Sequence, residues 1–248
     1  MRTNFHPNQI TTFLRYRIFL RYTILLKLRK KKFFALDKLD SKLIRLLSNK
    51  RGGYFVEIGG FDGVTYSMTK HLESYLGWTG LLIEPIKEKY EFCRMNRRKT
   101  TKVLNVACVP FEFPEEDVEI MELGPMSVIE TLDHRVGNFD KHLLAAENHL
   151  GRKGKPLRTP TMTLTDALQK AKSPREIDIL ILDVEGAEIE VLRGLDFEEF
   201  SFKNILIESR DDEFTISFLR GKGYRFVNKI SHADLYFERE IDSTLGHL

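Results

Sequence analysis

The sequence predicts an α/β fold built on a doubly wound, mostly parallel sheet that ends in an antiparallel hairpin. Strand-length apolar runs alternate with helical stretches, the run at 177–183 is the most hydrophobic, and two neighbouring strand-like segments close the body. Strands that alternate with helices form parallel sheets, and a strand buried on both faces is a continuous apolar run. The chain has 248 residues, of which 42% are hydrophobic and 30% charged, enough for one core.

The domain organisation follows from these patterns. We expect a basic extension and lead-in helix over 1–50, one domain over 51–240 and a tail over 241–248. The first half of the domain shows alternating short apolar runs and helical periodicity. Its predicted elements are, in order, a strand at 54–58, a helix at 66–76 that ends at Gly77, a strand at 80–85, a helix at 87–97 and a strand at 104–109.

The periodicity fades between 110 and 160, where prolines and the basic stretch GRKGKPLR interrupt it. We expect an insertion over the sheet edge, where loops that contact substrates commonly lie. The alternation then resumes. The predicted elements are a helix that starts at Thr163 or Thr165 and stops before Pro174, a central strand at 177–183, a helix at 187–192, a strand at 204–209, a helix ending near Gly221, and a hairpin of 224–230 with 233–239.

Charge is distributed unevenly along the chain. The formal net charge is +3, but the first 36 residues carry nine Lys or Arg and no acid, which leaves −6 for the remainder. Because the basic residues are confined to one segment, we do not expect a nucleic-acid partner. Cys93 and Cys108 lack CxxC spacing, which fits reduced thiols in a cytoplasmic protein.

The segment 13–34 clusters Lys and Arg beside Leu, Ile and Phe. Charges interrupt every apolar run well before the roughly 20 residues that a membrane span requires. Three readings stay open: peripheral contact with an anionic membrane surface, a basic arm for nucleic acid or a partner protein, and a helix packed on the body or a partly disordered arm. The sequence does not indicate an oligomeric state.

The stretch YFVEIGGFDG at 54–63 ends a strand in an acid and a glycine-rich turn. Counting from Gly59, Phe61 and Val64 stand where a dinucleotide fingerprint requires glycine. Glu57 and Asp62 flank the turn and would repel a pyrophosphate. The pattern E-x-G-x-x-x-G therefore favours a positively charged ligand with a ribose diol and no phosphate, such as S-adenosylmethionine, over a nicotinamide cofactor.

A second acid supports this cofactor. Glu84 ends the second predicted strand 27 residues after Glu57, compared with roughly 20 from fingerprint to ribose-binding acid in dinucleotide folds. We expect its carboxylate to accept both ribose hydroxyls; the alternative is a solvated strand end beside a purely structural turn. The predicted cofactor-binding residues are Glu57, Gly59, Gly60, Asp62, Gly63, Glu84 and Pro85.

Several blocks in this order and spacing resemble the FkbM-type methyltransferases. They are FVEIGGFDGVTYSMT, LGWTGLLIEP, NVACV, LDVEGAEIEVLRGLDF and the terminal GYRF through ADLYF, which together cover about residues 52 to 239. The resemblance implies a Rossmann-like, class I methyltransferase-like fold, S-adenosylmethionine as cofactor, and a small-molecule or glycan acceptor. Met68 stands where relatives often have Asn, and the stretch 110–160 matches only loosely, so the acceptor is not carried over.

Asp183 is the predicted base for methyl transfer. Transfer to a hydroxyl requires an oxygen in line with the S–CH₃ bond and a group that takes its proton. Asp183 ends the central strand at the ligand edge, and we predict Asp183 and Glu185 as the catalytic residues that face the acceptor. In the alternative reading, Asp183 orders the following turn, and Glu185 and Glu188 favour a helix start. These acids could also bind Mg²⁺, but we predict no metal site.

Histidines at 134, 142 and 149 lie in the insertion and offer other bases, although their spacing is not a zinc signature. The predicted function is therefore S-adenosylmethionine-dependent methylation, on the oxygen of a sugar hydroxyl in a glycan, glycolipid or secondary metabolite. The alternative is a non-catalytic interaction module of the same fold, targeted by its basic arm.

Overall fold

The computed structural model describes residues 32–129 and 139–240, with the side chains of 139–142 excepted. Most of the segment 13–34, the tail over 241–248, His134 and the side chain of His142 lie outside the described residues. Among the described residues, no helix has the length and apolar character needed to cross a membrane.

The main sheet has seven strands in the order β10-β11-β9-β8-β1-β2-β3. The five strands from β9 to β3 pair in parallel, and β11 joins β9 and β10 antiparallel. The predicted doubly wound sheet and terminal hairpin are thus confirmed. The strands are β1 (Tyr54–Ile58), β2 (Thr79–Ile83), β3 (Lys102–Leu104), β8 (Glu176–Leu182), β9 (Ser201–Glu208), β10 (Tyr224–Lys229) and β11 (Asp234–Arg239).

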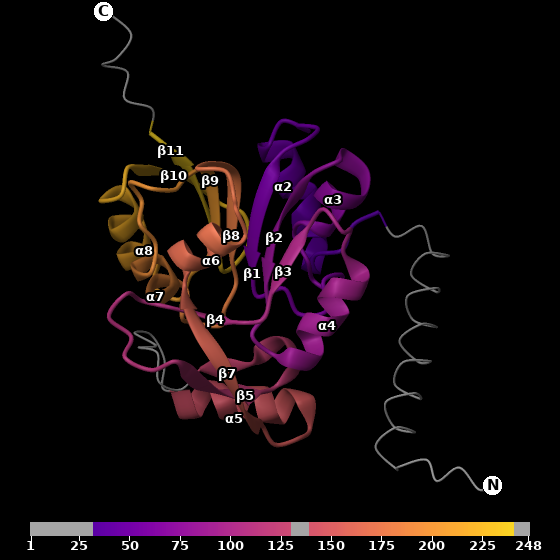
Figure 1. Ribbon diagram of the computed structural model, residues 1–248, viewed down its shortest axis with the longest axis vertical. Helices are drawn as coiled ribbons and strands as arrows, with labels where there is room; N and C mark the ends of the chain where they lie inside the picture. Colours follow the sequence, from indigo (N-terminus) through magenta and orange to yellow (C-terminus); the bar gives the residue numbers. More distant parts are fainter. Residues whose placement is uncertain (1–31, 130–138, 241–248) are drawn as a thin grey trace, which may run out of the picture.

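Helices cover both faces of this sheet (Figure 1). Alternate residues of the central strand β8 belong to different hydrophobic clusters, because successive side chains of a strand point to opposite faces. Leu180 and Leu182 pack with α6, α7 and α8, whereas Ile179 and Ile181 pack with α2 and α3. The helices are η1 (Leu36–Lys38), α2 (Leu39–Leu46), α3 (Lys70–Leu76), α4 (Lys87–Asn96), α6 (Leu164–Lys170), α7 (Glu188–Arg193) and α8 (Asp212–Arg220).

The predicted strand at 104–109 is wrong as a single element. It is split between β3, which pairs with β2, and β4 (Ala107–Val109), which pairs with β7 (Lys155–Thr163) in a second sheet. Asn105 lies at the break, and its side-chain amide donates to the carbonyl oxygens of Glu84 at 2.9 Å and Pro85 at 2.6 Å. This side chain ties the break to the end of β2.

The insertion at 110–160 is more regular than expected. It contributes β5 (Asp117–Glu122), η2 (Gly124–Met126), β6 (Val128–Ile129), α5 (Phe139–Leu150) and most of β7. The second sheet has the order β4-β7-β5-β6 and lies with α5 at the lower end of the main sheet in Figure 1. The insertion therefore forms a separate layer near the strand ends.

The predicted helix at 66–76 begins four residues late, at Lys70. The backbone N–H of Met68 donates to Glu57 Oε1 at 2.9 Å, and Tyr66 has a left-handed φ of 63°. A left-handed residue cannot continue an α-helix, so the chain stays in a turn until residue 69. The helix ends at Gly77, whose φ is 75°, as predicted.

Candidate active site

A cavity of about 810 Å³ lies at the carboxyl ends of the parallel strands. Ligands of open α/β sheets bind at this edge. Residues from the second sheet and from the turn between β10 and β11 complete the walls. The principal polar lining residues are Glu57, Glu84, Asp183, Glu185, Glu208 and Asp234, and the roof includes Ile120, Met126 and Ile129.

Gly59 brings the ends of β1 and β8 together. Its φ is 92°, and a Cβ there would stand 1.9 Å from the carbonyl oxygen of Asp183. Its N–H and that of Gly60 both donate to Ile83 O at 3.1 Å. A Cβ on Gly60 would overlap the Leu82 side chain at 2.7 Å. These glycines permit a close strand-end junction that a side chain would separate.

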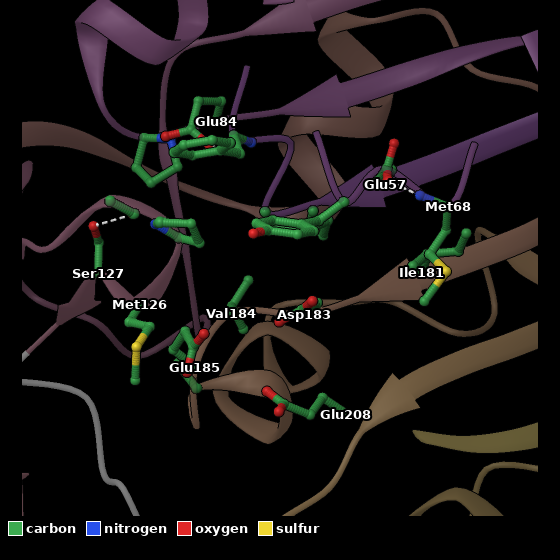
Figure 2. A pocket seen from close by; sticks show the side chains of 18 of the residues that line it. Glu57, Met68, Glu84, Met126, Ser127, Ile181, Asp183, Val184, Glu185 and Glu208 are labelled. Carbon is green, nitrogen blue, oxygen red and sulfur yellow. Dashed lines mark hydrogen bonds between the residues drawn. The ribbon is translucent and has the colours of Figure 1, made fainter. Parts of the chain in front are cut away.

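Glu84 presents a fixed carboxylate to the cavity, on the opposite wall from Asp183 (Figure 2). Its Oε2 accepts from the Phe61 N–H at 2.7 Å and its Oε1 from the Ile86 N–H at 2.9 Å. Burial raises the pKa of Glu84 to about 8. Both oxygens retain acceptor capacity, because each carboxylate oxygen has two lone pairs. Pro85 and Ile86 line the adjoining wall.

Asp62 and two of the predicted glycines do not line the cavity. Asp62 Oδ1 accepts from the N–H groups of Val64 at 2.8 Å and Thr65 at 2.6 Å, and its Oδ2 accepts from the Thr65 hydroxyl. Gly63 has a φ of 78° and lies against Cys93 of α4. Asp62, Gly60 and Gly63 therefore shape the turn behind the cavity wall.

Glu57 lines the cavity, but its charge is compensated inside the protein. Arg97 Nη2 lies 2.9 Å from Glu57 Oε2, and the two side chains are 0% and 5% exposed. Ser67 Oγ and Thr69 Oγ1 donate to the same carboxylate, as does the Met68 N–H in Figure 2. Met68 contributes its backbone here and its side chain to the cavity lining.

Asp183 and Glu185 face the cavity from the β8–α7 connection (Figure 2). Asp183 is open to the cavity but enclosed by protein on its other sides, and burial, followed by the charge of Glu208, raises its pKa well above the usual range. Burial likewise raises the pKa of Glu185 to about 8. Arg210 Nη2 donates to Glu185 Oε2 at 2.9 Å.

The Glu188 carboxyl group accepts hydrogen bonds from the backbone of the turn that precedes it. Its Oε1 accepts from the N–H groups of Val184 at 3.0 Å and Gly186 at 3.1 Å, at the start of α7. Burial raises its pKa to about 7. The alternative reading of Glu188 as a helix-start residue matches these contacts.

Sequence reasoning missed Glu208 and Asp234. Both line the cavity, Glu208 at the end of β9 and Asp234 at the start of β11. The sequence signal for Glu208 was its position near the end of NILIES, the predicted strand at 204–209. No sequence signal pointed to Asp234, because its position at the cavity depends on the turn between β10 and β11.

Part of the backbone strain of the described residues lies at this cavity. Asp37, Phe61, Tyr66 and Glu185 line it, and each has a left-handed φ between 47° and 63°. Such conformations are costly for non-glycine residues and cluster at functional sites. Tyr66 is also 50% exposed, so its ring is accessible at the cavity wall.

Among the histidines with described side chains, His149 and His232 line the cavity. His71 lies elsewhere, stacked on Phe33 with 5.3 Å between ring centroids. Within 32–129 and 139–240, no group of three or more His, Cys, Asp or Glu side chains has an arrangement that could hold a metal ion.

The cavity fits S-adenosylmethionine in two respects. Glu84 offers fixed acceptor oxygens for a ribose diol, beside apolar groups of Ile86 and Val106. On the opposite wall, the carboxyl groups of Asp183 and Glu185 suit a positive charge. The turn at 57–63 lacks the glycines of a phosphate-binding dinucleotide fingerprint, so it does not favour a cofactor that carries a pyrophosphate.

Comparison with solved structures gives methyltransferases at low identity. A methyltransferase from Geobacter sulfurreducens shares 13% identity over 95% of this chain and 99% of that chain, with a TM-score of 0.43. A putative RNA methyltransferase from Pyrococcus horikoshii shares 12% over 83% and 82%, with a TM-score of 0.42. Precorrin-6y C5,15-methyltransferase from Geobacter metallireducens shares 10% over 83% and 91%, with a TM-score of 0.43. At such low identities and TM-scores, these structures give no information about the acceptor of this chain.

No curated protein matches the chain in sequence. The methyltransferase FkbM domain, however, matches residues 57–226, which run from the last two residues of β1 to the first three residues of β10. The match spans more than half of the chain and runs through both the Glu57 turn and the Asp183 segment. The chain therefore belongs to the FkbM methyltransferase family, whose cofactor is S-adenosylmethionine.

Proposed function

We propose that this S-adenosylmethionine-dependent methyltransferase transfers the methyl group to oxygen, on a sugar hydroxyl of a small-molecule or glycan acceptor. One observation carries the proposal: Glu84 and Asp183 face the same cavity from opposite sides of the Gly59 turn. A cofactor held through its ribose at Glu84 would have its other end directed toward Asp183. The reacting groups and a proton acceptor would then lie together.

On the cofactor side, Glu84 would accept the ribose hydroxyls while its own position is fixed by the Phe61 and Ile86 N–H groups. Gly59 would allow close approach of the backbone, and Pro85 would line the adjoining wall. We assign Gly60, Asp62 and Gly63 to shaping the turn, and Glu57 to holding the 67–69 segment against the cavity. When bound, S-adenosylmethionine supplies an electrophilic methyl group on a sulfonium.

On the acceptor side, Asp183 would take the proton of the attacking hydroxyl, and Glu185 would help position that hydroxyl group. The raised pKa of Asp183 opposes this role in the ligand-free protein. A sulfonium beside the carboxyl group favours its ionised form, because an opposite charge at close range lowers the pKa of an acid. Cofactor binding would thereby prepare the base.

A polyol acceptor is supported by the mixture of side chains at the cavity. Tyr66 offers an accessible ring, and Asp183, Glu185 and Asp234 offer several carboxyl oxygens. Carboxylates accept hydrogen bonds from hydroxyl groups, while an aromatic ring covers an apolar face. The acidic balance beyond residue 36 disfavours a nucleic-acid acceptor.

The test is methyl transfer from radiolabelled S-adenosylmethionine to a panel of methyl glycosides, with a short single-stranded RNA as the competing acceptor. We expect label in a base-stable ether on a glycoside. Asp183→Asn should bind the cofactor yet lose about 100-fold or more in turnover, while Glu238→Gln, a surface change on β11, should match the wild type. Labelling of RNA alone would replace the sugar assignment, and folded protein without cofactor affinity would favour the interaction module.

A further inference from the structure

Two carboxyl groups leave neighbouring strands at the same level of the sheet. β8 and β9 pair in parallel, with Leu182 opposite Ile207, so the next residues along are Asp183 and Glu208. Both line the cavity, and Figure 2 shows them on the same wall. Their proximity is thus fixed by the register of two central strands.

Glu208 has an unsatisfied acceptor. Its Oε2 atom is buried and has no hydrogen-bond partner within the described part of the chain. A buried ionised oxygen without a donor is costly. Asp183 is the neighbouring acid, and the charge of Glu208, after burial, raises the pKa of Asp183. A proton on Asp183 therefore removes the repulsion between the two carboxyl groups.

We propose that Asp183 and Glu208 hold one proton between them and that Glu208 is a positioning residue for the base Asp183. This assignment rests on the proposed acceptor-side role of Asp183. Two close carboxyl groups cannot both ionise easily, so such a pair retains a proton over a wide pH range. The pair as a whole then carries a single negative charge.

The charged groups around the pair act on both members. The β9–α8 connection and the β10–β11 turn bring positive groups, which favour ionised Glu208. Acids on the β8–α7 connection and at β11 oppose ionised Asp183. The surrounding groups are Arg210 and His232, which are basic, and Glu185, Glu188 and Asp234, which are acidic; Lys42 and Lys229 in turn face Asp234.

The pair would act in the transfer as follows. The acceptor oxygen forms its bond to the methyl carbon as the S–C bond breaks, and the sulfur keeps that electron pair. The shared proton moves onto Glu208, and the ionised Asp183 then takes the hydroxyl proton. The pair then holds two protons and returns one to solvent. Glu208 thus keeps Asp183 able to accept a proton without leaving two adjacent negative charges.

The test uses the ligand-free full-length protein, labelled with ¹³C at the Asp and Glu carboxyl carbons, in an NMR pH titration. We expect the Asp183 and Glu208 signals of the wild type to titrate together in two steps. In Glu208→Gln the Asp183 signal should titrate in one step, with its midpoint lowered by about one pH unit or more, since the neighbouring charge is gone. Glu238→Gln should leave both signals unchanged.

The reciprocal variant Asp183→Asn keeps the test decisive if Glu208→Gln does not fold, because Glu208 should then titrate in one step. Independent one-step titrations in the wild type, unchanged in the variants, would overturn the pair. Since no cofactor or acceptor is present, this outcome is distinct from failure of the proposed function, which S-adenosylmethionine titration of the same samples measures separately.

Discussion

A Cβ on Gly59 would stand 1.9 Å from the carbonyl oxygen of Asp183. The backbone at the end of β1 therefore touches the backbone at the end of β8, and the Asp183 N–H donates to Ile58 O at 3.2 Å. The glycine-rich turn and the proposed base Asp183 are thus connected through backbone contacts that involve no side chain. A substitution at either residue should therefore displace the backbone at the other.

Gly59→Ala should destabilise the protein and abolish cofactor binding. The substitution combines a left-handed φ of 92° with a backbone overlap that no rotamer relieves. We expect a loss of at least about 3 kcal/mol in the free energy of unfolding, measured by urea denaturation.

Gly223→Ala is the matched control for this prediction. Its φ of 81° is similar, but nothing lies within 4 Å of the added Cβ. It should cost only about 1–2 kcal/mol and leave S-adenosylmethionine affinity intact. Equal losses for both variants would mean that the contact with Asp183 is unimportant.

Glu84→Gln should weaken S-adenosylmethionine binding by about 10- to 100-fold, equivalent to about 1.4–2.8 kcal/mol. The amide retains the shape but replaces one acceptor oxygen with a donor, which meets the N–H of Phe61 or Ile86. Calorimetric titration gives the affinity. Because 5′-methylthioadenosine retains the ribose, its binding should fall in parallel, and an unchanged affinity for both compounds would remove Glu84 from the ribose site.

Arg97→Met should lower the free energy of unfolding by about 3–5 kcal/mol, since it leaves buried Glu57 without its counter-charge. The double variant Glu57→Gln/Arg97→Met should recover part of this loss. Chemical denaturation of the two single variants and the double variant measures the coupling. Strict additivity would show that the ion pair does not fix the turn.

The parts of the fold that sequence reasoning captured depend on local pattern. The run at 177–183 contains four consecutive apolar residues at 179–182, and it forms most of β8 at the centre of the sheet. Glycine at 77 marked a helix end because a left-handed residue is required there. By contrast, LNVACV is continuous in pattern, and its division between two sheets depends on Asn105 bonds to the distant Glu84 and Pro85.

In the candidate site, too, some residues could be identified from local sequence pattern, whereas others depend on contacts between distant parts of the chain. Glu57 was singled out from a motif, and the motif contains no sign of Arg97, which lies 40 positions further along and neutralises it. Glu208 reaches the cavity through strand register, which one sequence does not specify. The residues that end strands are therefore identifiable from sequence, whereas the partners that set their charge are not.

The stability of the ligand-free protein should fall as pH rises from about 5 to about 8. Burial raises the pKa of Glu185 to about 8 and that of Glu188 to about 7. Between an ordinary value of about 4.5 and these values, the folded protein binds more protons than the unfolded chain. Stability is then fully present below the unfolded pKa and is lost toward the folded pKa.

Each such group contributes up to about 1.4 kcal/mol per pH unit, or roughly 3–6 °C in Tm. Thermal unfolding at pH 5, 6, 7 and 8 measures the slope. Glu185→Gln should flatten it, because the amide does not titrate, while exposed Glu198→Gln should leave it unchanged. Two results would contradict this prediction: a Tm of the wild type that rises across this range, or a slope that Glu185→Gln does not alter. Either would show that Glu185 ionises readily in the cavity. Glu185 would then carry its negative charge before the cofactor binds.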